Sequence, residues 1–159
     1  MTTTPTALSK STISQTVWEN IYDRLNDNVS SVTITGSSTI TIQTFTNNFP
    51  EKSLDKKGDY PIVVINPIEM DWKRLTFRKK QVSGTFVIDV YTTQTESADK
   101  FIDAIINSIE TYRDDLKGIN MFNVNLESTD SDNATRGSFS VHLRTCTFSF
   151  NYIFTETKV

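Results

Sequence analysis

The chain has 159 residues, of which 36% are hydrophobic and 22% are charged, and these values predict one folded domain with a sizeable core. Its net charge of −3 excludes a general attraction to nucleic acid or to an anionic membrane surface. The single cysteine excludes an internal disulfide, and no apolar run approaches the ~20 residues of a membrane-spanning helix.

The N-terminus is rich in Thr and has little to bury, so we expect a flexible arm over residues 1–10 and a single domain over residues 11–155. A helix is predicted to begin at Thr12, which forms a capping box with Gln15, and to end at residues 26–28. Its apolar stripe consists of Ile13, Val17, Trp18, Ile21, Tyr22 and Leu25.

Alternation of Val and Ile with Thr and Ser predicts two strands over residues 31–35 and 39–46, joined as a hairpin through Gly36. Residues 47–60 are polar and predict a long loop, and long loops in compact domains are often functional. The continuous apolar run over residues 61–65 predicts a central strand that is buried on both faces.

Residues 72–81 alternate apolar with basic side chains and predict an extended hairpin arm, which leads into a strand over residues 84–91. A long helix follows. We expect it to begin at a capping box of Thr93 and Glu96 and to end at Gly118 in the left-handed conformation. Its apolar stripe consists of Ala98, Phe101, Ile102, Ile105, Ile106, Ile109, Tyr112 and Leu116.

Two more strands are predicted over residues 121–126 and 138–154, with a polar loop over residues 128–137 between them. In the last strand the apolar residues change from odd to even positions near Arg144 and Thr145, which predicts a β-bulge there. This order of elements predicts an α+β fold: a mostly antiparallel β-sheet with two α-helices packed on one face, plus the extended β-hairpin arm.

Few residues of this sequence are candidates for catalysis or metal binding. His142 and Cys146 share a face of the predicted strand and form a conceivable nucleophile pair, but a cysteine among aromatic residues is usually core filler. Residues 130–133 suggest a calcium loop, yet Ala134 and Thr135 stand where a ligand and the turn glycine belong. The sequence has no phosphate-binding glycine loop, zinc-ligand set or serine triad, so we expect no enzyme, cofactor or metal.

One basic cluster stands out in this acidic chain, and it is interleaved with the apolar residues Trp72, Leu75 and Phe77. It consists of Lys73, Arg74, Arg78, Lys79 and Lys80. Three interpretations remain open: an oligonucleotide-binding surface, a hairpin whose charges prevent edge pairing, and an arm that contacts a partner of opposite charge.

The order of these features carries a resemblance. An aromatic residue and a proline, Tyr60 and Pro61, precede the apolar strand, and a Thr-rich segment links the strand over residues 85–91 to the long helix. The last strand ends in the aromatic-rich segment over residues 148–152. In this order, roughly residues 11–154 resemble the tail terminator (tail-to-head joining, or tail completion) proteins of long-tailed bacteriophages.

The resemblance implies a structural virion protein at the head-proximal end of the tail, assembled in the host cytoplasm without a membrane. It implies a homo-oligomeric, hexameric ring that caps the tail tube protein, ends tube polymerisation and binds a head-completion or connector protein. DNA would pass through the lumen without specific binding. The alternatives are another neck or tail-completion protein, and a nucleic-acid-binding α+β module that uses residues 72–80.

We expect the contacts of such a ring at exposed charged residues of the arm and of the two polar loops. In the arm these are Lys73, Arg74, Arg78, Lys79 and Lys80; in the loops they are Glu51, Lys52, Lys56, Asp130, Asp132 and Arg136.

Overall fold

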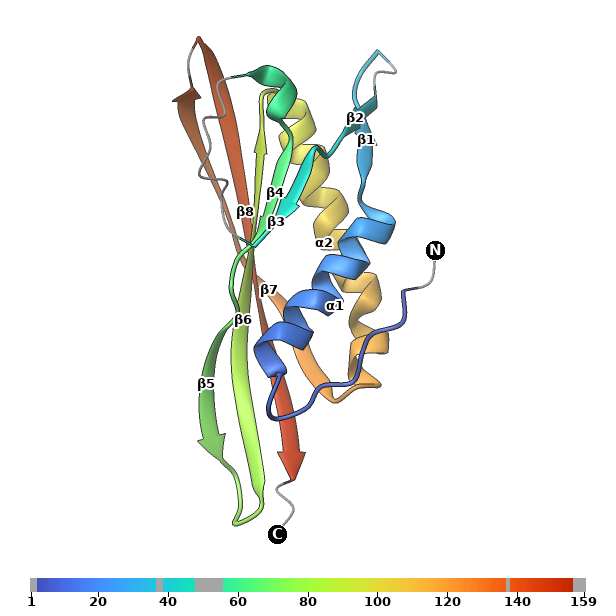
Figure 1. The fold of residues 1–159 in the computed structure, drawn as a ribbon, viewed down its shortest axis with the longest axis vertical. Helices are drawn as coiled ribbons and strands as arrows, with labels where there is room; N and C mark the ends of the chain where they lie inside the picture. Colours follow the sequence, from blue (N-terminus) through green and yellow to red (C-terminus); the bar gives the residue numbers. More distant parts are fainter. Residues whose placement is uncertain (1–2, 37–38, 48–55, 137, 156–159) are drawn as a thin grey trace.

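Two α-helices cover one face of a long, twisted β-sheet, and the sheet extends past them at both ends (Figure 1). This computed structural model describes residues 3–36, 39–47, 56–136 and 138–155. The main sheet has the strand order β3-β4-β6-β8-β7, with β5 also paired to β6, while β1 and β2 form a separate pair. All strand pairs except β3 with β4 are antiparallel, which confirms the predicted α+β fold class. The elements are α1 (Ile13–Asn28), β1 (Ser31–Thr33), β2 (Thr39–Thr41), β3 (Thr44–Thr46), the 3₁₀ helix η1 (Lys57–Asp59), β4 (Ile62–Ile65), β5 (Glu69–Arg74), β6 (Lys79–Thr92), α2 (Thr95–Lys117), β7 (Met121–Arg136) and β8 (Phe139–Thr155).

The segment before α1 packs against the rest of the domain. The Thr6 amide donates a hydrogen bond to Asn20 Oδ1 (2.8 Å), and Asn20 Nδ2 donates to the Thr6 carbonyl (2.9 Å). Leu8 is buried, and its carbonyl accepts a hydrogen bond from the Tyr152 hydroxyl (3.2 Å). The expectation that the N-terminal arm has little to bury is therefore wrong for residues 3–10.

Helix α1 buries the apolar stripe predicted for it. Its fully buried apolar members are Ile13, Val17, Ile21 and Leu25. Trp18 and Tyr22 are half-buried, and their rings stack at a centroid distance of 5.2 Å. The capping box of Thr12 and Gln15 is wrong, because the Thr12 side chain makes no capping hydrogen bond. Its hydroxyl shares a hydrogen bond with the Ser9 hydroxyl instead (2.8 Å).

The second strand of the predicted hairpin divides into two strands that belong to different sheets. β2 pairs with β1, whereas β3 pairs in parallel with β4. Two backbone hydrogen bonds mark the point at which the chain passes from one sheet to the other. The Ile42 amide donates to the Ser30 carbonyl (2.9 Å). The next amide, of Gln43, donates to the Pro61 carbonyl (2.9 Å). The prediction of one continuous strand over residues 39–46 is therefore wrong. The predicted central strand is confirmed, since β4 is buried at all four positions.

The long strands β6 and β8 pair without a break. The pairing runs from Lys79 opposite Thr155 to Thr92 opposite His142, with every intervening residue in register. A bulge would shift this register by one residue. The bulge predicted at residues 144–145 is therefore wrong.

The apolar residues of β8 change phase because the strand contributes to two clusters on opposite faces of the sheet. Phe139 and Val141 pack on the face away from the helices, in a cluster completed by Tyr60, Ile62 and Val64. On the helix-covered face, β8 buries Cys146, Phe148, Phe150 and Tyr152. The Phe148 ring stacks on the Phe86 ring of β6 at a centroid distance of 5.1 Å. A strand that exchanges its buried face has the same sequence pattern as a bulged strand.

β7 is one long strand at the edge of the sheet. It pairs with β8 along its length, with two register shifts before Ser128. The polar loop predicted over residues 128–137 is therefore wrong as far as residue 136. Side chains from 127 to 135 are exposed, so the hydrophobic alternation that normally identifies a strand is missing. The strand contains Asp130, Asp132 and Arg136.

Both ends of α2 differ from the prediction. The capping box of Thr93 and Glu96 is wrong, because Gln94 is the N-cap residue and makes no side-chain capping bond. Gly118 has a right-handed φ of −61°, and the left-handed residue is Asn120, with a φ of 64°. Asparagine tolerates this conformation better than most residues do. Neither helix of the described chain has the length and apolar character required to cross a membrane.

Candidate protein-interaction surfaces

The arm is the hairpin formed by β5 and the first half of β6, and it projects past the helices at one end of the molecule (Figure 1). β5 pairs with β6 along its whole length, from Glu69 to Arg74. At the turn, the Thr76 hydroxyl accepts a hydrogen bond from the Lys79 amide (3.0 Å). The extended hairpin arm predicted from the alternation of apolar and basic residues is therefore confirmed.

Three large apolar side chains of the arm are exposed to solvent. Their exposed fractions are 53% for Trp72, 42% for Leu75 and 68% for Phe77, and no other large hydrophobic side chain is exposed in the described residues. The Trp72 ring meets the Phe154 ring edge-on at 5.8 Å, and the Arg74 guanidinium lies 5.3 Å from the centre of the Phe77 ring. Exposed apolar side chains that gather in one place mark an interaction site.

The arm also brings together the five basic residues expected at a contact: Lys73, Arg74, Arg78, Lys79 and Lys80. Lys73, Arg78 and Lys79 make no ion pair with any carboxylate of the described residues. Because side chains alternate along a strand, Lys73 and Lys79 project from one face of the arm and Arg74 and Lys80 from the other. A partner therefore meets positive charge on either face.

The opposite edge of the sheet is acidic. Glu127, Asp130 and Asp132 are exposed on β7. Asp130 lies opposite Thr145 of β8, which in turn lies opposite Asp89 of β6, so the two aspartates share a row on the face away from the helices. Asp89 accepts a hydrogen bond from the Thr145 hydroxyl (2.5 Å). β7 ends and β8 begins at the other end of the long axis from the arm tip (Figure 1).

Both surfaces belong to open edges of one sheet. Within the described residues β5 pairs only with β6, and β7 pairs only with β8. β8 lies along the whole length of β6, so β5 and β7 are on opposite sides of the central pair. An open edge presents backbone N–H and C=O groups that another strand can bind.

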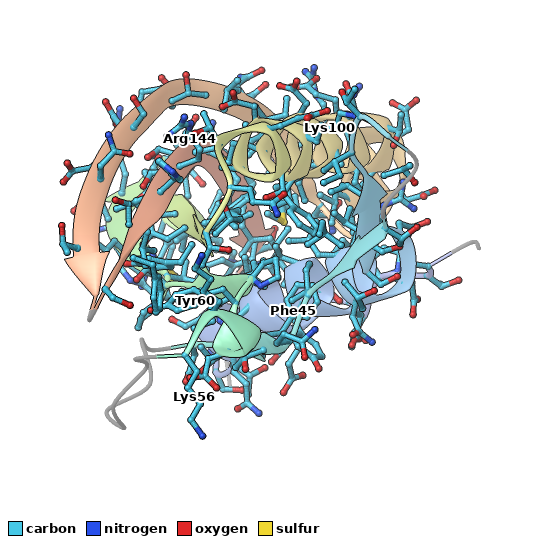
Figure 2. The ribbon with its side chains drawn as sticks, turned by 90° about the horizontal axis from the view of Figure 1, so that it is seen from above. Phe45, Lys56, Tyr60, Lys100 and Arg144 are labelled. Carbon is cyan, nitrogen blue, oxygen red and sulfur yellow. The ribbon has the colours of Figure 1, made fainter. Side chains whose placement is uncertain are left out.

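The other residues predicted as contacts lie elsewhere. Lys56 is exposed just before η1 and points outward (Figure 2). Arg136 is the last residue of β7 and pairs with Phe139. Glu51 and Lys52 lie outside the described residues. Of the predicted contact residues that the structure describes, the five in the arm therefore lie together, and the others are scattered.

His142 and Cys146 do not form a catalytic pair. His142 Nδ1 shares a hydrogen bond with Asn133 Oδ1 (2.7 Å), and its Nε2 lies 3.4 Å from the Thr95 hydroxyl oxygen. Cys146 is fully buried. Burial, followed by the negative charge of Asp89, raises the pKa of the Cys146 thiol to about 12. A thiol with this pKa remains protonated near neutral pH, and a nucleophilic cysteine must be a thiolate.

Sequence reasoning missed the acidic residues at the root of the arm. Two open hollows of about 490 and 470 Å³ lie beside β6 and share Glu69 and Thr85. Their linings also include Asp71 and Asp89, and no basic residue. The sequence signal that could have found them is the spacing of Glu69 and Asp71, which are two residues apart and so share one face of β5. No group of three or more His, Cys, Asp or Glu side chains is placed to hold a metal in the part of the chain that the structure describes.

The geometry is suited to binding through strand edges and an exposed arm. A comparison with models of known protein families and a search of curated proteins each find no match for this chain.

Proposed function

We propose that the chain is a structural protein that assembles into a hexameric ring, caps the tail tube of a long-tailed bacteriophage and provides the surface to which the head attaches. One observation carries the proposal: every exposed large apolar side chain of the described residues lies in one basic arm. Aromatic and Arg side chains are enriched at protein–protein interfaces, and Trp and Arg dominate their binding energy. Trp72, Phe77 and Arg74 supply these groups.

The position of the surfaces supports a ring. The arm and the β7 edge differ in sequence and lie on opposite sides of the sheet. A contact between two different surfaces is heterologous, and heterologous contacts produce a closed ring when their rotation closes. The number of six and the role at the tail come from the resemblance to tail terminator proteins.

Capping requires two unlike ring faces. One face binds the last ring of the tail tube protein, and the other binds a head-completion or connector protein and accepts no further tube subunit. DNA passes through the lumen without sequence-specific contacts. The virion is the site of action, after assembly in the host cytoplasm.

The experiment that tests this function uses the tail tube protein encoded by the same genome. Tube polymerisation is followed by electron microscopy with increasing amounts of the purified chain. We expect rings at one end of each tube and tube lengths that shorten as the chain is added. Tubes that grow to the same length at saturating concentration, with bare ends, would contradict the proposal.

A second candidate function is supported by the same arm. Exposed aromatic rings in a basic segment, as with Trp72 and Phe77 in the arm, are typical of surfaces that bind single-stranded nucleic acid. This function predicts oligonucleotide binding that falls steeply with salt and is lost in Lys79→Glu with Lys80→Glu. A terminator predicts weak binding without base preference. Tight, salt-sensitive oligonucleotide binding together with unaffected tube growth would select the second function.

A further inference from the structure

We propose that the arm of one copy binds the β7 edge of the next copy, so that neighbouring sheets join head to tail through β5 and β7. The partner is thus a second copy of this chain. The inference rests on the proposed function, because it specifies the contact that closes the ring.

The two edges can complete each other's hydrogen bonding. β5 is six residues long and has one open side, and β7 has an open side along its exposed stretch over residues 127–135. Addition of a strand to an open edge is a common mode of recognition, in which backbone hydrogen bonds supply affinity. Side chains on the two strands then decide which edges pair.

Charge selects this pairing over the alternatives. Lys73, Arg78 and Lys79 lie at the tip half of the arm without an ion-pair partner among the described residues, and Asp130 and Asp132 are exposed on β7. Lys79 lies opposite Thr155 at one end of β8, whereas Asp130 and Asp132 lie opposite Thr145 and Leu143. At about 3.3 Å per residue the two groups are roughly 30 Å apart or more along the sheet, so they cannot meet within one copy. Contact between two arm tips, or between two β7 edges, would oppose like charges.

Apolar contact supports the same arrangement. Leu75 and Phe77 at the arm tip are exposed and require cover in an assembled state. Tyr91 and Leu143 are half-buried on the face away from the helices, and they lie opposite each other, next to Asp132. This patch offers apolar surface bordered by acid, which matches the aromatic and basic surface of the arm.

Two charge-reversed chains test the contact. The arm variant carries Lys73→Glu with Lys79→Glu, and the edge variant carries Asp130→Lys with Asp132→Lys. The matched controls reverse an exposed charge on α2. All full-length chains are checked for folding by circular dichroism, and their mass is measured by sedimentation up to about 1 mM.

We expect the wild type and the controls Lys117→Glu and Asp103→Lys to associate. Each charge-reversed variant repels its own kind, and its association should weaken at least about tenfold. An equimolar mixture should regain the wild-type mass, because each arm then meets an edge of opposite charge. Hydrogen exchange at residues 129–135 should slow in the mixture as in the wild type, since added strand pairing protects these amides.

Three results would overturn the contact: a wild type that stays monomeric at about 1 mM, an edge variant that associates like the wild type, or a mixture that stays monomeric. An unaffected edge variant beside a weakened arm variant would indicate that two arms pair with each other. The tube experiment separates this contact from the proposed function. If both variants still form rings that cap tubes, the proposed function stands and the contact is wrong. If mixing the variants restores association but the chain does not cap tubes, the contact stands and the proposed function is wrong.

Discussion

Gly84 of β6 lies opposite Phe150 of β8, and the Phe150 ring occupies the space that a Cβ atom at position 84 would need. On its other side, that Cβ would approach the Glu69 carbonyl oxygen to 3.1 Å. Phe150 is buried beneath α1 and α2 and packs near Phe86, so its ring has little room to move. Gly84 also lies opposite Met70 near the start of β5, so the pair lies at the base of the arm.

Gly84→Ala should lower the free energy of unfolding by about 1–3 kcal/mol, because the added methyl group overfills a packed core. Urea denaturation measures the change. Gly58→Ala is the matched control, since no atom lies within 4 Å of its added Cβ, and its effect should stay within about 0.5 kcal/mol. Equal stability of the two variants would show that Phe150 can move aside.

The Tyr112 hydroxyl is buried and has no hydrogen-bond partner among the described residues. Tyr112→Phe should therefore leave the free energy of unfolding unchanged or raise it by up to about 2 kcal/mol. Tyr152→Phe is the control, because it removes the hydrogen bond to the Leu8 carbonyl and should cost about 1 kcal/mol. Both are measured by thermal and urea unfolding. A larger loss in Tyr112→Phe than in Tyr152→Phe would reveal a bond to that hydroxyl.

Stability should fall as pH rises above about 9, because burial raises the pKa of the Cys146 thiol from 9.0 to about 12. Between these values the unfolded chain loses a proton that the folded chain keeps, so the contribution is complete below pH 9 and is lost as pH rises toward 12. The slope attributable to this thiol is about 1.4 kcal/mol per pH unit. Cys146→Ala, which has no thiol, should show a shallower decline, and an unchanged slope would exclude this source.

Glu96 connects the β1–β2 hairpin to α2. Its Oε1 accepts from the Thr35 amide (2.8 Å) and the Thr35 hydroxyl (2.6 Å) and lies 3.2 Å from Lys100 Nζ. The hydrogen bonds from the Thr35 side chain and amide, followed by Lys100, lower the pKa of Glu96. Their stabilisation is therefore present above the ordinary value of 4.5 and is lost as pH falls through the lowered pKa.

Glu96→Ala should accelerate hydrogen exchange in β1 and β2 with little effect on β6 or β8. Glu96→Gln, which retains an acceptor oxygen, should show a smaller acceleration. In the wild type the same hairpin amides should exchange faster, after correction for intrinsic rates, as pH is lowered well below 4.5. Protection of the hairpin that is equal in all three chains would contradict the connection.

Sequence patterns predicted the parts of the fold that bury a continuous apolar surface. Both helices and the arm carry a regular spacing of apolar residues, and β4 is a continuous apolar run; each occurs where its pattern placed it. The failures occur where burial does not follow one face. β8 exchanges its buried face between Val141 and Cys146, and beyond Ser128 both faces of β7 are exposed, so neither pattern is periodic.

The capping boxes predicted at the helix starts were less reliable, because a polar side chain near a helix end can form hydrogen bonds with several different groups. Glu96 binds Thr35 of the hairpin rather than the backbone at the start of α2. The basic cluster of the arm was visible in the sequence, and so were Asp130 and Asp132 as exposed charges, but their position on an edge strand was not. Asp89 joins the row of Asp130 only through the register of three strands, which no single stretch of sequence contains.

The chain contains two tryptophans, and the structure gives them opposite surroundings. Trp18 is half-buried, stacks on Tyr22 and donates its indole N–H to the Ile65 carbonyl (2.7 Å), whereas Trp72 is 53% exposed in the arm. Intrinsic fluorescence therefore contains two separable signals without any label. In Trp72→Phe the emission of Trp18 reports unfolding of the domain. In Trp18→Phe a blue shift in the emission of Trp72 reports burial of the arm against a partner.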